Sequence, residues 1–268
     1  MKFLRATIKL ISFLLVTLFL YSLIMASLIG AIIGVNYEKI RGYLLRFWGR
    51  CICKIIGIKL EVKGKIPNPP FLLVSNHLSY IDVFVLFSQL RCLFVAKSDV
   101  KTWPLMGFII RTCGILFIDR NRKRDITRVN KLISKNINEN QGIILFPEGT
   151  TSPGMEVLPF RTPLLEYPAT EDLSVSYVAI SYESKKKEQP AYESICWWDD
   201  ASFFSHFMNV LKMKGFKAKL HFGETPVKEN DRKLLAEKLH SAVKNNFKPV
   251  VTKEAFNAKH DVFKPLSF

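Results

Sequence analysis

The chain has 268 residues, of which 49% are hydrophobic, and it carries a formal net charge of +16 at pH 7. This length accommodates one sizeable domain and an anchor, because single hydrophobic cores usually stop growing at about 250–300 residues. A surface this basic favours an anionic partner, either nucleic acid or the anionic face of a membrane. The sequence has no zinc-finger spacing, RNA-binding signature or basic heptad region. We therefore expect an anionic membrane surface rather than nucleic acid as the partner.

The N-terminal segment is apolar over a long stretch. No charged residue occurs from Leu10 to Val35, and about 20 apolar residues suffice for a helix to cross a bilayer. A cleaved signal peptide has a shorter apolar core of about 7–15 residues, so the sequence predicts an uncleaved anchor. Basic residues are more numerous on its C-terminal side, between Lys39 and Lys54. This bias predicts a protein of the cytoplasmic membrane whose large domain faces the cytoplasm.

An alternative for the same segment is a re-entrant or interfacial hairpin with both ends on the cytoplasmic side. The following segment, Tyr37–Ile56, mixes large apolar residues with Arg and Lys, which is typical of a helix lying among lipid headgroups. We therefore assign residues 1–57 to a membrane anchor and an interfacial helix. Residues 58–250 form the main domain, and residues 251–268, which have no clear pattern, form a C-terminal tail.

Beyond the anchor, short β-rich runs alternate with helical patterns. Strands are predicted at 58–62, 71–75, 93–96, 114–118, 142–145, 174–182, 194–198 and 216–222. Helices are predicted at 79–90, 124–140 and 231–246, with a further helix-like run that ends at Arg111. Strands that alternate with helices indicate an α/β fold. We expect a mixed, largely parallel sheet flanked by helices and preceded by an N-terminal membrane-anchoring helix.

Two residues that are able to move a proton follow the predicted strand 71–75. His77 and Asp82 lie five positions apart. Histidine is the usual general base, and a carboxylate on its far nitrogen fixes the tautomer and stabilises the imidazolium. Five residues of an ideal helix rotate by about 500°, so the two side chains pair only if His77 precedes the helix and Asp82 lies in its first turns. Ser79 fits this arrangement as the cap, and the alternative is a surface histidine with a capping carboxylate.

A second polar cluster, Glu148-Gly149-Thr150, follows the predicted strand 142–145. Glutamate at this position is suited to accept a hydrogen bond from a substrate hydroxyl or to position a headgroup. Gly149 lets the backbone approach a ligand closely, and successive N–H groups there are suited to bind phosphate or an oxyanion. Ligands of open α/β sheets bind where strands end, so we expect both clusters to share one site. The alternative is a turn with an exposed acid.

Together these residues resemble the glycerolipid acyltransferase family, whose best-known members are the 1-acylglycerol-3-phosphate acyltransferases. The resemblance covers roughly residues 61–250 and rests on three blocks in the same order, at 76–82, 114–120 and 146–150. It implies that residues 58–250 are an acyltransferase domain with His77 and Asp82 as catalytic residues. It also implies that the following residues bind the acceptor, the first of them at its phosphate: Arg120, Glu148, Gly149 and Thr150.

Two positions depart from the family pattern. Thr151 stands where the third block often continues with arginine, and the candidate for the fourth block, 175–180, lacks the usual proline. Without a cation beside the acceptor pocket, the acceptor headgroup stays open between phosphate, a lyso-ornithine lipid and another lysophospholipid. Arg161 is a candidate to supply the absent charge, and the alternative is an ordinary surface arginine.

The resemblance implies an enzyme that transfers a fatty acyl group from acyl-CoA or acyl carrier protein to the free hydroxyl of a lysolipid. The first choice of acceptor is 1-acylglycerol-3-phosphate, in phospholipid biosynthesis. No cofactor or metal is expected, and the five cysteines lack a metal-binding spacing. Two other functions stay open, an acyl thioester hydrolase and a membrane-bound lipid-binding protein without catalysis.

Overall fold

The computed structural model describes residues 1–102, 106–119, 123–260 and 263. Within these residues all of the strands join in one seven-stranded sheet. The strands are β1 (Ile58–Lys63), β2 (Leu72–Ser75), β3 (Cys92–Lys97), β4 (Leu116–Ile118), β5 (Gly142–Leu145), β6 (Val175–Ser184) and β7 (Phe216–Phe222). The helices are α1 (Lys2–Gly30), α2 (Tyr37–Ile56), α3 (Ile81–Gln89), α4 (Met106–Thr112), α5 (Lys123–Asn136), α6 (Glu166–Thr170), α7 (Ala191–Ser194), α8 (Phe203–Lys212), α9 (Arg232–Asn246) and α10 (Lys253–Asn257).

The strand order of the sheet is β1-β7-β6-β2-β5-β3-β4. Every neighbouring pair is parallel except β6 and β7, which are antiparallel. Parallel strands need long crossover connections, and helices provide most of them here. The predicted mixed, largely parallel sheet is confirmed. Because β2 and β5 are parallel neighbours, the turns that carry His77 and Glu148 leave the sheet at the same edge.

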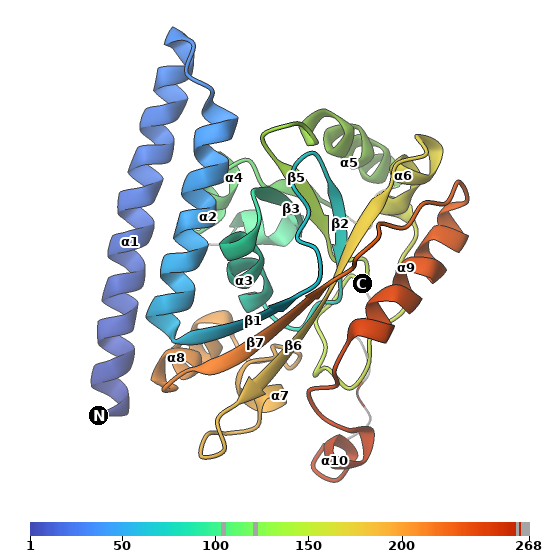
Figure 1. Ribbon diagram of the computed structural model, residues 1–268. Helices are drawn as coiled ribbons and strands as arrows, with labels where there is room; N and C mark the ends of the chain where they lie inside the picture. The colour runs from blue at the N-terminus through green and yellow to red at the C-terminus, as the bar shows by residue number, and fades with distance from the viewer. Residues whose placement is uncertain (103–105, 120–122, 261–262, 264–268) are drawn as a thin grey trace.

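The sheet separates two hydrophobic cores. Helices α1, α2, α3 and α8 pack on one face, and α5 and α9 cover the other (Figure 1). Strand β2 contributes to both cores, with Leu73 in the first and with Leu72 and Val74 in the second. This alternation follows from the two-residue period of a strand. The fully apolar β2 is therefore a central strand that is buried on both faces.

Helices α1 and α2 form an antiparallel hairpin along one side of the molecule (Figure 1). Asn36 begins α2 as its N-cap and accepts a hydrogen bond from the backbone N–H of Lys39. One face of α1 packs against α2 and α8, while most of its remaining apolar surface is exposed. Among the described residues, Lys2–Ile33 is the one helical segment that is long and apolar enough to cross a membrane, judged by length and composition.

The predicted strand at 194–198 is wrong. Helix α7 ends at Ser194, and the residues that follow have no regular secondary structure. The two tryptophans of this segment bond to nearby carbonyl groups: Trp197 Nε1 donates to Ala201 O (2.8 Å) and Trp198 Nε1 donates to Tyr192 O (2.6 Å). Aromatic residues are common in strands, which is why the sequence predicted one here. In the described structure, however, the segment pairs with no strand.

Residues 251–260, part of the predicted C-terminal tail, pack against the main domain. Thr252 caps α10 by accepting a hydrogen bond from the backbone N–H of Ala255. Phe256 is fully buried, and its ring lies 5.1 Å from that of Trp198 and 5.9 Å from that of Tyr192. The segment thereby covers the loop that follows α7.

Candidate active site

His77 and Asp82 meet at the junction between β2 and α3. His77 lies in the turn after β2, and Asp82 lies in the first turn of α3. The distance between His77 Nδ1 and Asp82 Oδ2 is 2.7 Å. The structure therefore has the geometry that the five-residue spacing demands. Ser79 is not the helix cap, which is Tyr80, although its hydroxyl oxygen accepts a hydrogen bond from the N–H of Ile81 (3.3 Å).

Four hydrogen bonds hold the carboxylate of Asp82, whose side chain is fully buried. Besides the imidazole, Oδ2 accepts from the backbone N–H groups of Leu78 (2.7 Å) and Ser79 (3.1 Å). The other oxygen, Oδ1, accepts from the hydroxyl of Tyr182 at 2.5 Å. Charged groups away from water need such partners. When Nδ1–H donates to Asp82, the Nε2 atom of His77 is the one able to take up a proton.

The imidazole of His77 keeps 21% of its side-chain surface exposed. Its ring stacks on Phe146, with ring centroids 4.0 Å apart, and Phe146 stacks in turn on Phe94. The stacking fixes the plane of the imidazole, and the hydrogen bond to Asp82 fixes its rotation. Such an arrangement keeps a base in one orientation, which is what general-base catalysis requires.

Glu148 supports the turn that carries His77. Its Oε2 accepts from the backbone N–H of His77 (3.1 Å), and its Oε1 accepts from the backbone N–H of Leu158 (3.1 Å). The side chain is 3% exposed. Burial raises the pKa of Glu148 well above its ordinary value, and the two N–H donors act in the opposite direction. The carboxyl group therefore ties two loops together through their backbones.

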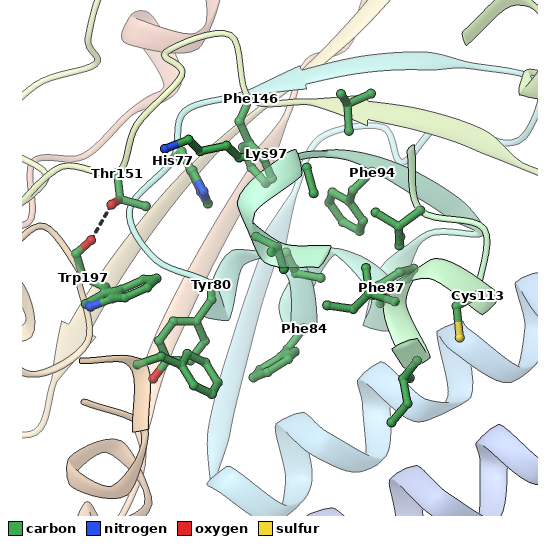
Figure 2. Close-up of a pocket in the computed structure, with 18 of the residues that line it drawn as sticks. His77, Tyr80, Phe84, Phe87, Phe94, Lys97, Cys113, Phe146, Thr151 and Trp197 are labelled. Carbon is green, nitrogen blue, oxygen red and sulfur yellow. Dashed lines mark hydrogen bonds between the residues drawn. The ribbon is translucent and has the colours of Figure 1, made fainter. Parts of the chain in front are cut away.

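A cavity of about 560 Å³ lies beside His77 and extends toward the N-terminal hairpin. Figure 2 shows His77, Lys97, Thr151 and Trp197 around one end, with Cys113 at the other. The wall between the two ends is mostly aromatic and aliphatic, and it includes Tyr80, Phe84, Phe87, Phe94, Leu20 and Ile24. Binding cavities typically have about 300–1,000 Å³. An apolar space of this size suits a hydrocarbon chain.

Gly149 and Thr150 line the same cavity as His77. Gly149 has a φ angle of 77°, a left-handed conformation that glycine adopts at little cost. The hydroxyl of the adjacent Thr151 donates to the backbone carbonyl of Trp197 (Figure 2). The segment after β5 is thereby fixed against the loop after α7, and its backbone borders the space next to the imidazole.

Comparison with known proteins identifies the family. A family model described as Acyltransferase matches residues 57–181. The lyso-ornithine lipid O-acyltransferase of Rhizobium meliloti (strain 1021) is 32% identical over 200 residues, which cover 69% of this chain and 68% of that protein. The chain belongs to the acyltransferase family. The resemblance seen in the three sequence blocks is thus confirmed, and the protein is an enzyme of acyl transfer.

A second relative and one solved structure are also similar to this acyltransferase. The 1-acyl-sn-glycerol-3-phosphate acyltransferase of Neisseria meningitidis serogroup B (strain ATCC BAA-335 / MC58) is 28% identical over 207 residues, which cover 73% of this chain and 77% of that protein. The crystal structure of the 1-acyl-sn-glycerophosphate acyltransferase from Thermotoga maritima superimposes with a TM-score of 0.62 at 21% identity. That match covers 91% of this chain and 97% of the other, and it shows a shared fold.

The structure describes one of the two arginines that are predicted to bind the acceptor. Arg120 lies outside the described residues, one position beyond Asp119. Arg161 is exposed, and its backbone N–H donates to Pro147 O at 2.8 Å. It therefore lies next to the 146–150 block of the acyltransferase. A role in acceptor binding stays a prediction for both arginines.

The sequence did not reveal two side chains that brace this site, Tyr182 and His206. His206 Nε2 lies 3.1 Å from Cys196 O, and its Nδ1 lies 2.8 Å from the hydroxyl of Tyr80. Burial lowers the pKa of His206, which favours a neutral ring that donates through Nε2 and accepts from Tyr80 through Nδ1. Tyr80 is thereby held in the cavity wall. Its partner is 126 positions away in the chain, beyond the reach of any local pattern.

Proposed function

We propose that the acyltransferase transfers a fatty acyl group from acyl-CoA or acyl carrier protein to the free hydroxyl of a lysolipid. The observation that carries the proposal is the His77–Asp82 pair at the polar end of a long apolar cavity. A lysolipid and an acyl thioester each join a reactive polar group to a hydrocarbon chain. The cavity accommodates such a chain with its reactive end at the imidazole.

The mechanism follows from the contacts of His77. Its Nε2 accepts the proton of the lysolipid hydroxyl as the hydroxyl oxygen attacks the thioester carbon. Asp82 stabilises the imidazolium through Nδ1–H. The carbonyl oxygen gains negative charge and needs hydrogen-bond donors, a role that we assign to backbone N–H groups near Gly149 or at the start of α3. The N–H of Gly149 itself donates to Phe146 O (3.1 Å). The carbon–sulfur bond then breaks, and the imidazolium returns its proton to the departing thiolate. Direct transfer in a ternary complex needs neither a covalent enzyme intermediate nor a metal.

For the acceptor, our first choice is 1-acylglycerol-3-phosphate. The name of the Neisseria relative supports it, and so does the second sequence block, in which Arg120 meets the acceptor phosphate according to the family resemblance. Arg161, beside the third block, is the further cation that we assign to the phosphate.

Lyso-ornithine lipid is the second candidate. The name of the Rhizobium relative supports it, and the absence of arginine after Thr150 weakens the case for an anionic headgroup. A panel of 1-acylglycerol-3-phosphate, lyso-ornithine lipid and a zwitterionic lysophospholipid, offered to one enzyme with one donor, separates the candidates. We expect Arg120→Ala to raise KM for the phosphate acceptor several times more than for the zwitterionic one. Equal losses with both acceptors contradict the phosphate role.

We also propose that the α1–α2 hairpin holds the enzyme on the cytoplasmic membrane, with the main domain in the cytoplasm. The exposed apolar surface of α1 supports membrane contact, as do the exposed rings of Phe108 and Phe204. Arg5 Nη1 donates to Lys212 O (2.9 Å), and Lys9 Nζ donates to Met213 O (2.9 Å). Because these bonds join the start of α1 to the main domain, they favour the interfacial hairpin over a spanning helix.

A paired assay tests the proposed reaction. Purified enzyme is mixed with a labelled acyl thioester, with or without lysolipid in vesicles. We expect diacylated lipid and free thiol with the lysolipid, and little free fatty acid without it. Fatty acid released at the same rate without an acceptor identifies a thioester hydrolase. Lysolipid binding without any turnover identifies a non-catalytic lipid-binding protein.

A further inference from the structure

Tyr182 reaches the catalytic pair from a distant part of the chain. It lies near the end of β6, and its hydroxyl donates to Asp82 Oδ1 at 2.5 Å. Asp82 Oδ2 carries the other three hydrogen bonds of this carboxylate, from His77, Leu78 and Ser79. Within the described structure Tyr182 is therefore the single donor to Oδ1. Removing this hydroxyl leaves a buried carboxylate oxygen unpaired, which is costly for a charged group.

We propose that Tyr182 is a positioning residue of the acyl-transfer reaction, whose hydroxyl orients the Asp82 carboxylate toward His77. The inference rests on the proposed function, in which Asp82 orients and stabilises the general base. Three donors on Oδ2 fix one carboxylate oxygen, and the bond to Oδ1 fixes the rotation of the group about its Cβ–Cγ axis. A carboxylate held at both oxygens keeps the imidazole in one orientation while its charge changes.

The position of Tyr182 is itself rigid. The residue pairs with Ala218 in the antiparallel β6–β7 ladder, and its ring packs edge-on against Phe216 at 5.8 Å. The side chain is 3% exposed. Burial first, and then the negative charge of Asp82, hold the pKa of Tyr182 well above its ordinary value. The phenol therefore keeps its proton and stays a donor.

Strand β6 also holds the other side of the His77 turn. The side-chain amide of Asn76 donates from Nδ2 to Ile180 O (3.0 Å) and accepts at Oδ1 from Ile180 N–H (2.8 Å). Ile180 and Tyr182 are two positions apart on the strand. One strand thus fixes the residue before His77 through its backbone and the orienting carboxylate through a side chain. The Tyr182–Asp82 hydrogen bond is thus one of several contacts by which β6 supports the His77 turn.

The test compares Tyr182→Phe with Tyr177→Phe. Tyr177 lies on the same strand, but it packs in the core on the opposite face of the sheet, so both variants lose one phenolic oxygen from β6. We expect Tyr182→Phe to lower kcat by about tenfold with KM for acceptor and donor unchanged. Tyr177→Phe should keep kcat within about twofold of the parent. Equal kcat values for the two variants overturn the inference.

A double substitution separates positioning from a general loss of structure. If Tyr182 acts through Asp82, adding Tyr182→Phe to Asp82→Asn should change kcat by less than about twofold. A further tenfold loss in the double variant overturns the inference, because the phenol would then act independently of the carboxylate. Failure of the proposed function gives another pattern, in which His77→Ala and Asp82→Asn both retain normal rates. Thermal unfolding of each variant shows that kcat is measured on folded protein.

Discussion

Asp82 and Glu148 are both buried carboxylic acids that follow adjacent parallel strands, yet their partners differ in kind. Asp82 contacts the side chains of His77 and Tyr182 as well as two backbone N–H groups. Within the described structure Glu148 accepts hydrogen bonds from backbone N–H groups alone, those of His77 and Leu158. In the proposed mechanism, one carboxylate meets an imidazole that gains charge, and the other meets backbone groups whose charge does not change.

Burial alone therefore does not distinguish a carboxylate that takes part in the proposed reaction from one that holds two loops together. A carboxylate whose partner becomes an imidazolium contributes mainly to the transition state. A carboxyl group between two loops contributes mainly to the folded state. We therefore expect substitutions at Asp82 to change rate more than stability, and substitutions at Glu148 to change stability more than rate.

The largest expected effect is that of Asp82→Asn. The asparagine no longer stabilises the imidazolium and favours the wrong tautomer of His77, so kcat should fall by roughly 10³–10⁴-fold. Steady-state acylation of lysolipid by purified protein measures this loss. Glu148→Gln is the matched control, because it makes the same acid-to-amide change in the other carboxylic acid. If the Asp82→Asn variant retains more than about a tenth of the parent kcat, Asp82 does not act mainly on the rate, and the two carboxylic acids do not differ in this respect.

Glu148→Gln should act mainly on stability. Its amide group presents N–H donors to one of the two backbone N–H groups, so the unfolding free energy near pH 5 should fall by about 1–2 kcal/mol. We expect kcat of the folded variant to fall by no more than about tenfold. Denaturant titration in detergent measures the first quantity, and kinetics at a temperature well below unfolding measure the second. A loss of kcat as large as that of Asp82→Asn assigns Glu148 a direct part in the reaction.

The raised pKa of Glu148 also makes the stability of the protein depend on pH. Burial raises the pKa of folded Glu148 above its unfolded value of about 4.3, so the folded state holds this proton more tightly. The resulting stability is fully present below the unfolded pKa and is lost as pH rises through the folded pKa. The advantage of the parent over Glu148→Gln in unfolding free energy should therefore shrink from pH 4 to pH 8. An advantage that grows with pH contradicts the raised pKa.

The smallest expected effect is that of Arg161→Ala. The side chain is exposed, so the unfolding free energy should change by less than about 0.5 kcal/mol. If Arg161 binds the acceptor, KM for 1-acylglycerol-3-phosphate should rise by about two- to fivefold, the range of a solvent-screened charge pair, with kcat unchanged. Identical KM values in parent and variant remove Arg161 from the acceptor site.

The sequence predicted the parts of the site that depend on local pattern. The apolar runs that became β2 and β5 were visible, and the spacing of His77 and Asp82 required the turn-then-helix geometry that the structure shows. The contact between Tyr182 and Asp82 spans 100 positions and depends on how β6 pairs with β2, which no local period encodes. The partners of Glu148 are backbone N–H groups. Every residue type except proline has such a group, so the sequence does not indicate which ones Glu148 contacts. The predicted strand at 194–198 failed because tryptophans bury their rings equally well in a loop.

The proposed role of His77 as general base is tested by measuring lysolipid acylation with purified His77→Ala protein. His221→Ala serves as the control, since His221 lies on β7 and has no part in the proposed mechanism. Both proteins are assayed in vesicles with the same thioester donor, after their unfolding temperatures have been compared. We expect His77→Ala to lose at least about 10³-fold in kcat while His221→Ala stays near the parent. A folded His77→Ala enzyme that acylates at the parent rate contradicts the role of His77 as the base.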